Sequence, residues 1–279
     1  MLDRKVKIKE IRDLGAGNYL LTLSASEQAS LVQAGQFVML KCVDSLDDNP
    51  LLRRPFSVFD THPHARTGRP AGLDLLVKHV GAGTDKLTRL ERGSSIYVLG
   101  PQGRPFHVSA EMRNRVGMAC VVAGGVGIAA LYLLAKSLMA QDVRPVLFYG
   151  GRNVADLVLR EYFEHLGIPV FFTTEDGSLG ERGLVTLPLE RFLKANPRKD
   201  MRIYCCGPWE MMKAVHNLAL RHHLPCEASL EARMGCSLGA CMGCVIQAHD
   251  DKGEEHYIRV CQEGPVMNSR AVDWETSPF

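Results

Sequence analysis

Four cysteines near the C-terminal end of the chain restrict the possible folds more than any other feature. Cys236, Cys241 and Cys244 are separated by four and by two residues, and Cys261 follows after sixteen more. A C-x4-C-x2-C loop with a distant fourth cysteine is the plant-type ligand spacing of a 2Fe–2S cluster. One loop can present three thiolates to a cluster only if it curls tightly, which small residues permit. The small residues in and beside this loop are Gly235, Gly239, Ala240 and Gly243.

Three other uses of these cysteines are open from their spacing alone. A structural zinc site usually offers two short C-x2-C pairs, and this stretch contains one. A Rieske centre needs two histidine ligands, and His249 and His256 lie nearby without paired spacing. Four unliganded buried cysteines would bind no metal. The spacing favours the 2Fe–2S cluster over all three, with its fourth ligand on a strand predicted over residues 257–261.

Length and charge limit the class of protein. The chain has 279 residues, of which 46% are hydrophobic, and its formal net charge is +2. This length suits two domains and a small module. The balanced charge points to neither nucleic acid nor an anionic membrane as a partner. The nine cysteines are too unevenly placed for a disulfide framework, and cluster assembly needs a reducing compartment, so we expect a cytoplasmic protein.

No targeting or membrane-spanning segment is expected. The first ten residues lack the apolar core of a signal peptide. Residues 116–135 carry no charge over the length of a membrane span. Four glycines interrupt this run, however, so a buried strand, a glycine turn and a buried helix explain it better. These glycines are Gly117, Gly124, Gly125 and Gly127.

The predicted fold class combines β and α/β architecture in three regions. In residues 1–106, short strand-like runs between Gly, Pro and Asp clusters predict an antiparallel β-barrel. In residues 107–223, strand-like and helix-like segments alternate, as in a parallel sheet with crossover helices. Residues 224–279 would form the cluster module. The predicted strands are residues 18–23, 36–41, 73–78, 95–99, 118–123, 146–149, 170–173 and 202–206, and the predicted helices are residues 128–140, 154–166, 186–195 and 209–222.

Two motifs in the predicted barrel could bind a phosphate-bearing ligand. Arg53 and Arg54 stand at the start of a strand, followed by Pro-Phe-Ser, and a guanidinium can hold a pyrophosphate bidentately. Residues 81–85 place glycines and Thr84 at a helix start, where backbone N–H groups attract anions. Each motif alone also has an ordinary explanation. The first could be a surface pair beside an edge-strand proline, and the second a turn with Thr84 as the helix N-cap.

A glycine turn joins the first parallel strand to its helix. Gly125, Gly127 and Ala130 fit the G-x-G-x-x-A dinucleotide pattern in a strand–turn–helix context. Close packing of helix against strand is the alternative reason for these glycines. The next strand ends in Gly-Gly-Arg-Asn at residues 150–153, without the acid that commonly binds a ribose. A standard two-halved Rossmann domain is therefore not expected.

Two further turns follow strands of this region. Cys206, Gly207 and Pro208 end the last strand, and ligands of open α/β sheets bind beyond the carboxyl ends of strands. A Cys-Gly-Pro sequence is also an ordinary strand terminator. Residues 176–178, Asp-Gly-Ser, are expected to form a plain turn.

Taken in order, these motifs resemble the ferredoxin–NADP reductase superfamily over nearly the whole chain. The stretch from Ser229 to Pro265 is more specific and resembles electron-transfer subunits of class 1B dihydroorotate dehydrogenases. By this resemblance, FAD would contact Arg54, Pro55, Phe56, Ser57, Leu76, Val77, Lys78, Gly83 and Thr84. The nicotinamide nucleotide would contact Gly124, Gly125, Gly127, Cys206 and Gly207, and the 2Fe–2S cluster would bind Cys236, Cys241, Cys244 and Cys261.

Two residues depart from the family pattern. Ser237 stands where a glycine usually follows the first cluster ligand, and Ala130 stands where a proline is usual. Neither change removes a ligand, so the expected cofactors are unaltered.

The resemblance implies an oxidoreductase subunit of pyrimidine biosynthesis. Electrons would pass from the FMN of a catalytic partner through the 2Fe–2S cluster and FAD to NAD+, in a heterotetramer with two of each subunit. No catalytic acid or base is predicted, since the cofactors carry the chemistry. The alternatives are a ferredoxin:NAD(P) oxidoreductase or hydrogenase diaphorase-type subunit, and a zinc-stabilised adaptor without redox activity.

Overall fold

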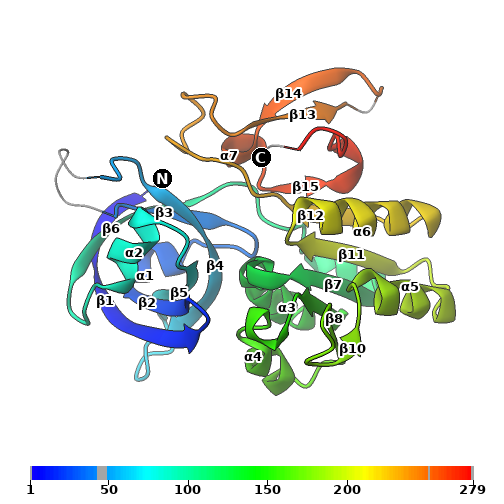
Figure 1. Cartoon of the computed structure of the whole chain (residues 1–279), viewed down its shortest axis with the longest axis horizontal. Helices are drawn as coiled ribbons and strands as arrows, with labels where there is room; N and C mark the ends of the chain where they lie inside the picture. Colours follow the sequence, from blue (N-terminus) through cyan, green and yellow to red (C-terminus); the bar gives the residue numbers. More distant parts are fainter. Residues whose placement is uncertain (1, 43–48, 251, 278–279) are drawn as a thin grey trace.

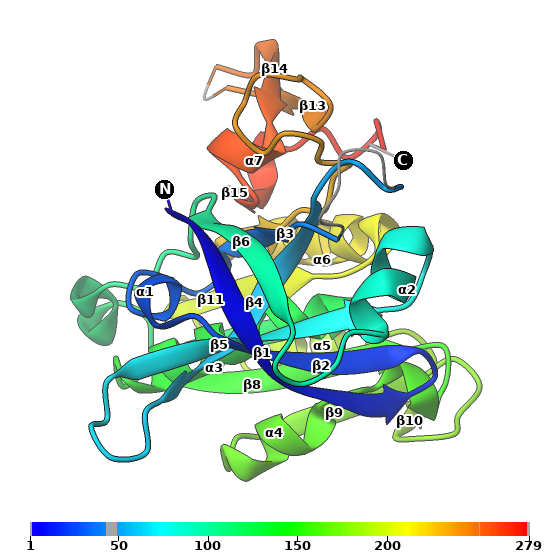
Figure 2. The same cartoon turned by 90° about the vertical axis from the view of Figure 1, so that its left-hand side faces the viewer.

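The computed structural model describes residues 2–42, 49–250 and 252–277. Figure 1 shows a barrel in blue and cyan beside a sheet with helices in green and yellow. A smaller C-terminal segment, in orange and red, lies above both parts in Figure 1 and also above them in the turned view of Figure 2. The predicted fold class is therefore confirmed.

Six strands close an antiparallel barrel in the order β1-β2-β5-β4-β3-β6. In β6 every second residue is buried, which is the period of a strand with one face in the core. The long strand β1 was not predicted, because charged residues occupy most of its length and only Val6 and Ile8 are buried. The strands are β1 (Leu2–Gly15), β2 (Asn18–Ser24), β3 (Phe37–Leu40), β4 (Arg54–Pro63), β5 (Pro70–Lys78) and β6 (Ser95–Gln102), with the short helices α1 (Ser26–Ala29) and α2 (Ala82–Thr88).

A seven-stranded sheet forms the second part, in the order β10-β9-β8-β7-β11-β12-β15. All its pairs are parallel except that between β12 and β15. The central strand β7 is buried almost throughout, as expected for a strand with helices on both faces. The strands are β7 (Met118–Gly124), β8 (Arg144–Gly151), β9 (Val170–Thr174), β10 (Glu181–Arg182), β11 (Met201–Cys206), β12 (Cys226–Ser229) and β15 (Val266–Asn268).

Two pairs of helices cover the two faces of this sheet. Leu134 and Phe163 of α3 and α4 pack in one apolar core, and Leu189 and Val215 of α5 and α6 pack in another. The alternation of side chains along the strands supplies both cores. The helices are α3 (Tyr132–Met139), α4 (Arg160–His165), α5 (Thr186–Ala195) and α6 (Trp209–Arg221), with 3-10 turns η1 (Ala110–Asn114), η2 (Gly125–Ala130) and η3 (Val154–Asp156).

Two predicted helices differ from the structure. The helix predicted over residues 128–140 begins as the 3-10 turn η2 and becomes α-helical at Tyr132. The helix predicted over residues 154–166 is broken before α4, where Leu159 has a left-handed φ of 58°. Leu157 and Leu159 are buried there, so core packing overrides the local helix preference of these residues.

The C-terminal segment is tied to the sheet. Strands β12 and β15 pair with β11 and with each other, so the sheet crosses the domain boundary predicted at residue 223. That boundary and the one at residue 106 remain predictions. The strand predicted over residues 257–261 is wrong at its end, because Cys261 lies in the helical turn after it. These elements are β13 (Val245–His249), β14 (Glu255–Arg259), α7 (Val260–Glu263) and η4 (Ser269–Ala271).

An aromatic junction fixes the barrel against the sheet and its helices. Phe59 of β4 stacks on Tyr132 of α3 with ring centroids 4.7 Å apart. Beside this pair, Lys136 donates a hydrogen bond to Asp60 at 2.7 Å. A half-buried ion pair next to stacked rings holds the two parts in one orientation. The carboxyl edge of the sheet is thereby set beside one end of the barrel.

Candidate cofactor sites

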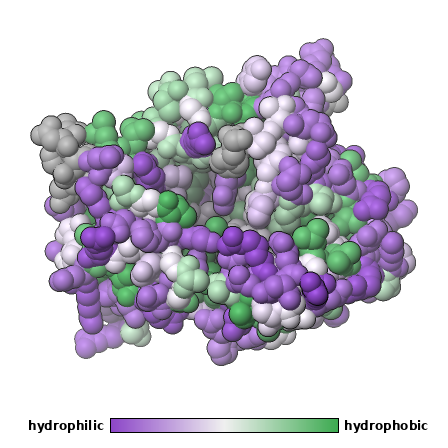
Figure 3. Space-filling model, viewed as in Figure 1, coloured by the Kyte–Doolittle hydropathy of each residue, from purple (hydrophilic) through white to green (hydrophobic). Residues whose placement is uncertain are grey.

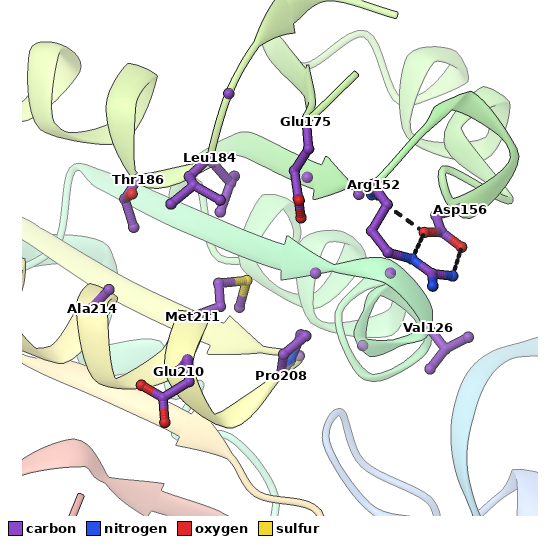
Figure 4. A pocket seen from close by; sticks show the side chains of 18 of the residues that line it. Val126, Arg152, Asp156, Glu175, Leu184, Thr186, Pro208, Glu210, Met211 and Ala214 are labelled. Carbon is purple, nitrogen blue, oxygen red and sulfur yellow. Dashed lines mark hydrogen bonds and ion pairs between the residues drawn. The ribbon is translucent and has the colours of Figure 1, made fainter. Parts of the chain in front are cut away.

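A cavity of about 530 Å³ opens at the carboxyl edge of the parallel strands. Figure 4 shows side chains converging on it from the segments that follow β8, β9 and β11. Lys78, at the end of the barrel strand β5, also lines it. Ligands of open α/β sheets bind in this position. The predicted nucleotide residues that line the cavity are Gly124, Gly125, Gly127 and Gly207.

The glycines of the η2 turn have two different roles. A Cβ on Gly127 would lie 2.4 Å from the carbonyl oxygen of Cys206, and one on Gly207 would lie 2.9 Å from Gly124 Cα. Gly125 has a φ of +50° and no atom within 4 Å of its Cβ position. Gly127 and Gly207 therefore bring two backbones together, whereas Gly125 faces open space where a ligand can approach.

The hydroxyl of Tyr149, on the neighbouring strand β8, contacts the backbone of the η2 turn and of the segment that follows β8. It lies 3.0 Å from the carbonyl oxygen of Gly125, 3.1 Å from that of Asp156 and 3.2 Å from that of Val158. The ring is fully buried, and burial raises the pKa of the hydroxyl, so it remains a donor. Nothing in the local sequence pattern indicated this role, which depends on the parallel pairing of β8 with β7.

The other two predicted turns lie at the same edge of the sheet. Cys206 is only 2% exposed and is not among the side chains that line the cavity; burial raises the pKa of its thiol. Asp176 accepts hydrogen bonds from the backbone N–H and hydroxyl of Ser178. Ser178 in turn accepts from Val154 N–H at 2.8 Å. The Asp-Gly-Ser turn thus connects the loops after β8 and β9.

The barrel opens next to this cavity, between β4 and β5. The ladder of these strands begins at Val58 and Leu75, and a register shift follows it. Residues 54–57 pair instead with β3, and residues 76–78 pair with β2. Residues 54–57 of β4 and residues 76–78 of β5 therefore form no backbone pairs with one another. The turn η2 packs against both strands. The residues predicted to contact FAD on these edges are Arg54, Pro55, Phe56, Ser57, Leu76, Val77 and Lys78.

The two phosphate-binding motifs of the barrel meet at this opening. A Cβ on Gly83 would lie 3.4 Å from the Arg54 side chain, so Arg54 lies against the start of α2. Arg54 donates to the carbonyl oxygens of Leu52 and Arg53 and forms no ion pair within the described part of the chain. Thr84 is not the N-cap: its hydroxyl accepts from the backbone N–H groups of Val80 and Gly81.

The four cluster cysteines form two pairs. Cys241 donates its backbone N–H to Cys236 Sγ at 3.4 Å, and Cys261 donates its own to Cys244 Sγ at 3.5 Å. Leu238 N–H also reaches Cys236 Sγ, at 3.3 Å. These donors, Leu238 first, lower the pKa of Cys236 to about 6, whereas burial raises the pKa of Cys244 to about 11. N–H donors at sulfur favour the thiolate that iron requires.

The two pairs match the ligand arrangement of a 2Fe–2S cluster, which can take two cysteines on each iron. His249 and His256 lie near the turn of the β13–β14 hairpin, opposite the end that carries Cys244 and Cys261. They do not supply Rieske ligands.

Two side chains that the motif analysis missed hold the cysteine loop. Gln262 donates to the carbonyl oxygen of Ser237 at 3.0 Å, and Arg259 donates to that of Gly239 at 3.2 Å. Glu263 accepts a hydrogen bond from the Arg259 guanidinium at 2.6 Å and holds it in place. In the sequence, only their positions beside Cys261 could have indicated that these side chains contact the cysteine loop.

Ser237 has a left-handed φ of +55°, a conformation that glycine adopts at less cost than any other residue. Its hydroxyl donates to the carbonyl oxygen of Cys236 at 2.6 Å. We expect Ser237→Gly to retain the cluster, because glycine adopts this φ freely. Ser237→Val should lose most of its iron, because a β-branched residue is strongly disfavoured at positive φ. Iron content and visible absorption measure both, and equal iron in the two variants would contradict the role given to this backbone conformation.

Comparison with known proteins identifies the family. A family model described as the iron–sulfur cluster binding domain of dihydroorotate dehydrogenase B matches residues 231–273. The dihydroorotate dehydrogenase B (NAD(+)) electron transfer subunit of Desulforamulus reducens is 33% identical over 270 residues, covering 96% of this chain and 97% of that protein. The chain belongs to this family of electron transfer subunits. The subunit from Caldanaerobacter subterraneus subsp. tengcongensis is 37% identical over 238 residues, or 85% of this chain and 86% of that protein.

The other matches agree with membership of this family of electron transfer subunits. A model described as an oxidoreductase NAD-binding domain matches residues 121–217. A solved NADH-dependent reduced ferredoxin-NADP oxidoreductase has a TM-score of 0.80 at 26% identity, covering 97% of this chain and 90% of that chain. Phthalate dioxygenase reductase, at 18% identity and a TM-score of 0.61, covers 93% of this chain and 77% of that chain and shares the fold. The predicted family, oxidoreductase class, iron–sulfur domain and NAD-binding domain are confirmed. In the described residues, no helix has the length and apolar character of a membrane span.

Proposed function

We propose that this chain carries electrons between NAD(H) and the FMN of a catalytic partner subunit that oxidises dihydroorotate, in pyrimidine biosynthesis. In this proposal, residues 1–106 bind FAD, residues 107–223 bind the nucleotide and residues 224–279 hold the 2Fe–2S cluster. Two copies of each subunit would form the complex. FAD exchanges two electrons with nicotinamide and single electrons with a cluster, so it supplies the step between them.

The observation that carries this proposal is the convergence of three sites on one end of the barrel. The η2 turn packs against β4 and β5, beside the gap between these strands. On the other side, a Cβ on Gly235 of the cysteine loop would lie 3.6 Å from Leu52, two residues before β4. A nucleotide, a flavin and a cluster held in these sites would be neighbours, which electron transfer requires.

The barrel residues suit FAD by charge and by shape. The unpaired edges of β4 and β5 offer backbone N–H and carbonyl groups to a planar ring system. The Arg54 guanidinium, with no acidic partner in the described ranges, can bind the pyrophosphate, and the lack of a side chain at Gly83 lets Arg54 lie against the start of α2.

We expect Arg54→Ala to weaken FAD binding about tenfold or more, because a charge-assisted hydrogen bond contributes roughly 1.5–3 kcal/mol. Arg53→Ala is the matched control. The guanidinium of Arg53 binds both carboxylate oxygens of Asp3, at 3.0 and 2.7 Å, and should not reach the flavin phosphates. Flavin content after dialysis and fluorescence titration with FAD measure the difference. Equal losses in both variants would show that Arg54 is not the phosphate ligand.

The partner subunit is proposed to dock over the cysteine loop. Cys241 is exposed at the surface. Figure 3 shows hydrophobic surface at the top of the molecule, where Figure 1 places this loop. Leu51, Leu52, Leu238 and Met242 are each more than half exposed and lie on or beside the loop. Exposed apolar groups around a redox centre are typical of an interface with another protein.

Reconstitution tests the function and this surface together. The protein mixed with an FMN-containing dihydroorotate dehydrogenase subunit should give NAD-dependent dihydroorotate oxidation. Leu52→Asp should lower the coupled rate at least about tenfold, because a buried unpaired carboxylate costs several kcal/mol at an interface. Leu187→Asp, at an exposed leucine of α5, should not. No coupled activity with any such subunit, although NADH reduces the flavin, would leave only a stand-alone reductase.

A further inference from the structure

A second cavity, of about 220 Å³, lies at the edge of the parallel sheet where the strands begin, opposite the nucleotide cavity. Met201, at the start of β11, and Pro225, directly before β12, line it. Its other wall is the segment 107–116, which joins the barrel to β7 through η1. The residues assigned above to FAD, the nucleotide and the cluster all lie in the described ranges, and none of them lines this cavity.

Two buried polar atoms at this cavity lack a partner. Ser109 Oγ and Arg202 Nε belong to residues that line it, and neither atom forms a hydrogen bond within residues 2–42, 49–250 and 252–277. Buried polar atoms of native proteins are nearly always paired with protein, water or a ligand. The Ser109 hydroxyl and the Arg202 guanidinium are therefore available as donors to a group bound in this cavity.

The charged side chains that line the cavity are mostly cations. Arg115 and Lys199 are exposed, and within the described part of the chain neither side chain forms an ion pair or a hydrogen bond. Arg202 is only partly compensated, because its Nη2 lies 3.7 Å from a carboxylate oxygen of Glu227, beyond hydrogen-bond distance. Among the lining residues, all of them described, Glu111 is the one acid. The excess of positive charge favours an anion.

The number and kind of donors indicate a phosphate group. A guanidinium can bind two oxygens at once, so two guanidinium groups already occupy both oxygens of a carboxylate, whereas a phosphate offers more. The cavity is several times the roughly 30 Å³ share of one water, so it has room for such a group. We infer that this cavity binds a phosphate group, free or at the end of a small metabolite, through Arg115, Lys199 and Arg202. The Ser109 hydroxyl donates to the same group.

A phosphate group bound here joins two parts of the fold. Ser109 and Arg115 belong to the segment between the barrel and the sheet, whereas Arg202 belongs to β11. In the protein itself, the Tyr204 hydroxyl already ties this segment to β11 by donating to the carbonyl oxygen of His107 at 3.2 Å. Because the anion binds the folded chain and not the unfolded one, phosphate should raise the melting temperature.

Calorimetric titration of inorganic phosphate into the full-length, FAD-loaded protein tests this inference. Saturating NAD+ occupies the nucleotide cavity, and potassium chloride at equal ionic strength is the blank. Arg115→Gln should weaken phosphate binding about tenfold, because it removes a charge-assisted hydrogen bond. Arg144→Gln removes the same charge from an exposed arginine at the start of β8, outside the cavity, and should bind phosphate as the parent does.

Ser109→Ala separates binding from packing. Its hydroxyl has no partner in the described ranges, so without phosphate the variant should unfold at the urea concentration of the parent or above it. Its affinity for phosphate should nevertheless fall about threefold or more. Ribose 5-phosphate identifies the source of the group: tighter binding than inorganic phosphate assigns the site to a phosphorylated metabolite, and equal or weaker binding assigns it to free phosphate.

Three results would overturn the inference. The first is no saturable binding of phosphate to the parent protein, which would leave a cavity filled by water. The second is equal affinity in the parent, Arg115→Gln and Arg144→Gln, which would place the phosphate elsewhere. The third is binding of acetate as tight as that of phosphate, since a singly charged carboxylate would then satisfy the same donors.

Discussion

Gly127→Ala is expected to destabilise the nucleotide-binding part of the chain by about 3 kcal/mol or more, one of the largest effects of a single methyl group. The added Cβ would lie 2.4 Å from the carbonyl oxygen and 2.5 Å from the carbonyl carbon of Cys206. Both atoms belong to the backbone of β11, which pairs with β7 along its whole length. No side chain can rotate to relieve this overlap, so the backbone of the η2 turn or of the end of β11 must shift.

Gly125→Ala is the matched control in the same turn. Its Cβ would meet no atom within 4 Å, and the cost is limited to about 1–2 kcal/mol for the left-handed φ. We expect this variant to stay folded and to raise the KM for NADH, because its methyl group would project into the cavity where we propose that the nucleotide binds. Urea unfolding and NADH-driven flavin reduction measure both properties. If Gly127→Ala unfolded at the urea concentration of the parent, the close approach of the η2 turn to the end of β11 would not be a packing requirement.

The features that sequence predicted best depend on short-range spacing. The cysteine motif needs a loop of fixed length, and the first strand of the sheet with its glycine turn needs consecutive residues only. The start of β4 at Arg54 and the position of β5 were predicted for the same reason. A pattern of this kind is visible because the residues that carry it are neighbours in the chain.

The features that sequence did not predict depend on tertiary contacts. Cys261 lies on a helical turn that is bound to the distant cysteine loop, because Val260 N–H donates to the carbonyl oxygen of Cys244 and the Gln262 side chain donates to that of Ser237, both at 3.0 Å. Leu159 adopts a left-handed φ because the segment before α4 is drawn into the core and held there by Tyr149. Strand β1 was not predicted because charged residues on its exposed face obscure the alternation of buried and exposed positions. Each case follows from a partner distant in sequence, which local propensity does not contain.

The four proposed cluster ligands belong to a loop and a helical turn outside the barrel, so removing the cluster should leave the flavin step intact. We expect Cys244→Ser to lose the 2Fe–2S signal in electron paramagnetic resonance of the reduced protein, because serine is a poor ligand for iron. Cys42→Ser, at a buried cysteine outside the motif, is the control and should retain it.

NADH should still reduce FAD in the Cys244→Ser variant, because the nucleotide cavity and the gap between β4 and β5 contain no cluster cysteine. NAD-dependent dihydroorotate oxidation in the reconstituted complex should fall to the background of the partner alone. The exposed position of Cys241, at the surface where we propose the partner docks, places the cluster between that partner and the flavin. Coupled oxidation at the parent rate, with iron absent by analysis and by resonance, would show that electrons reach the flavin by another route.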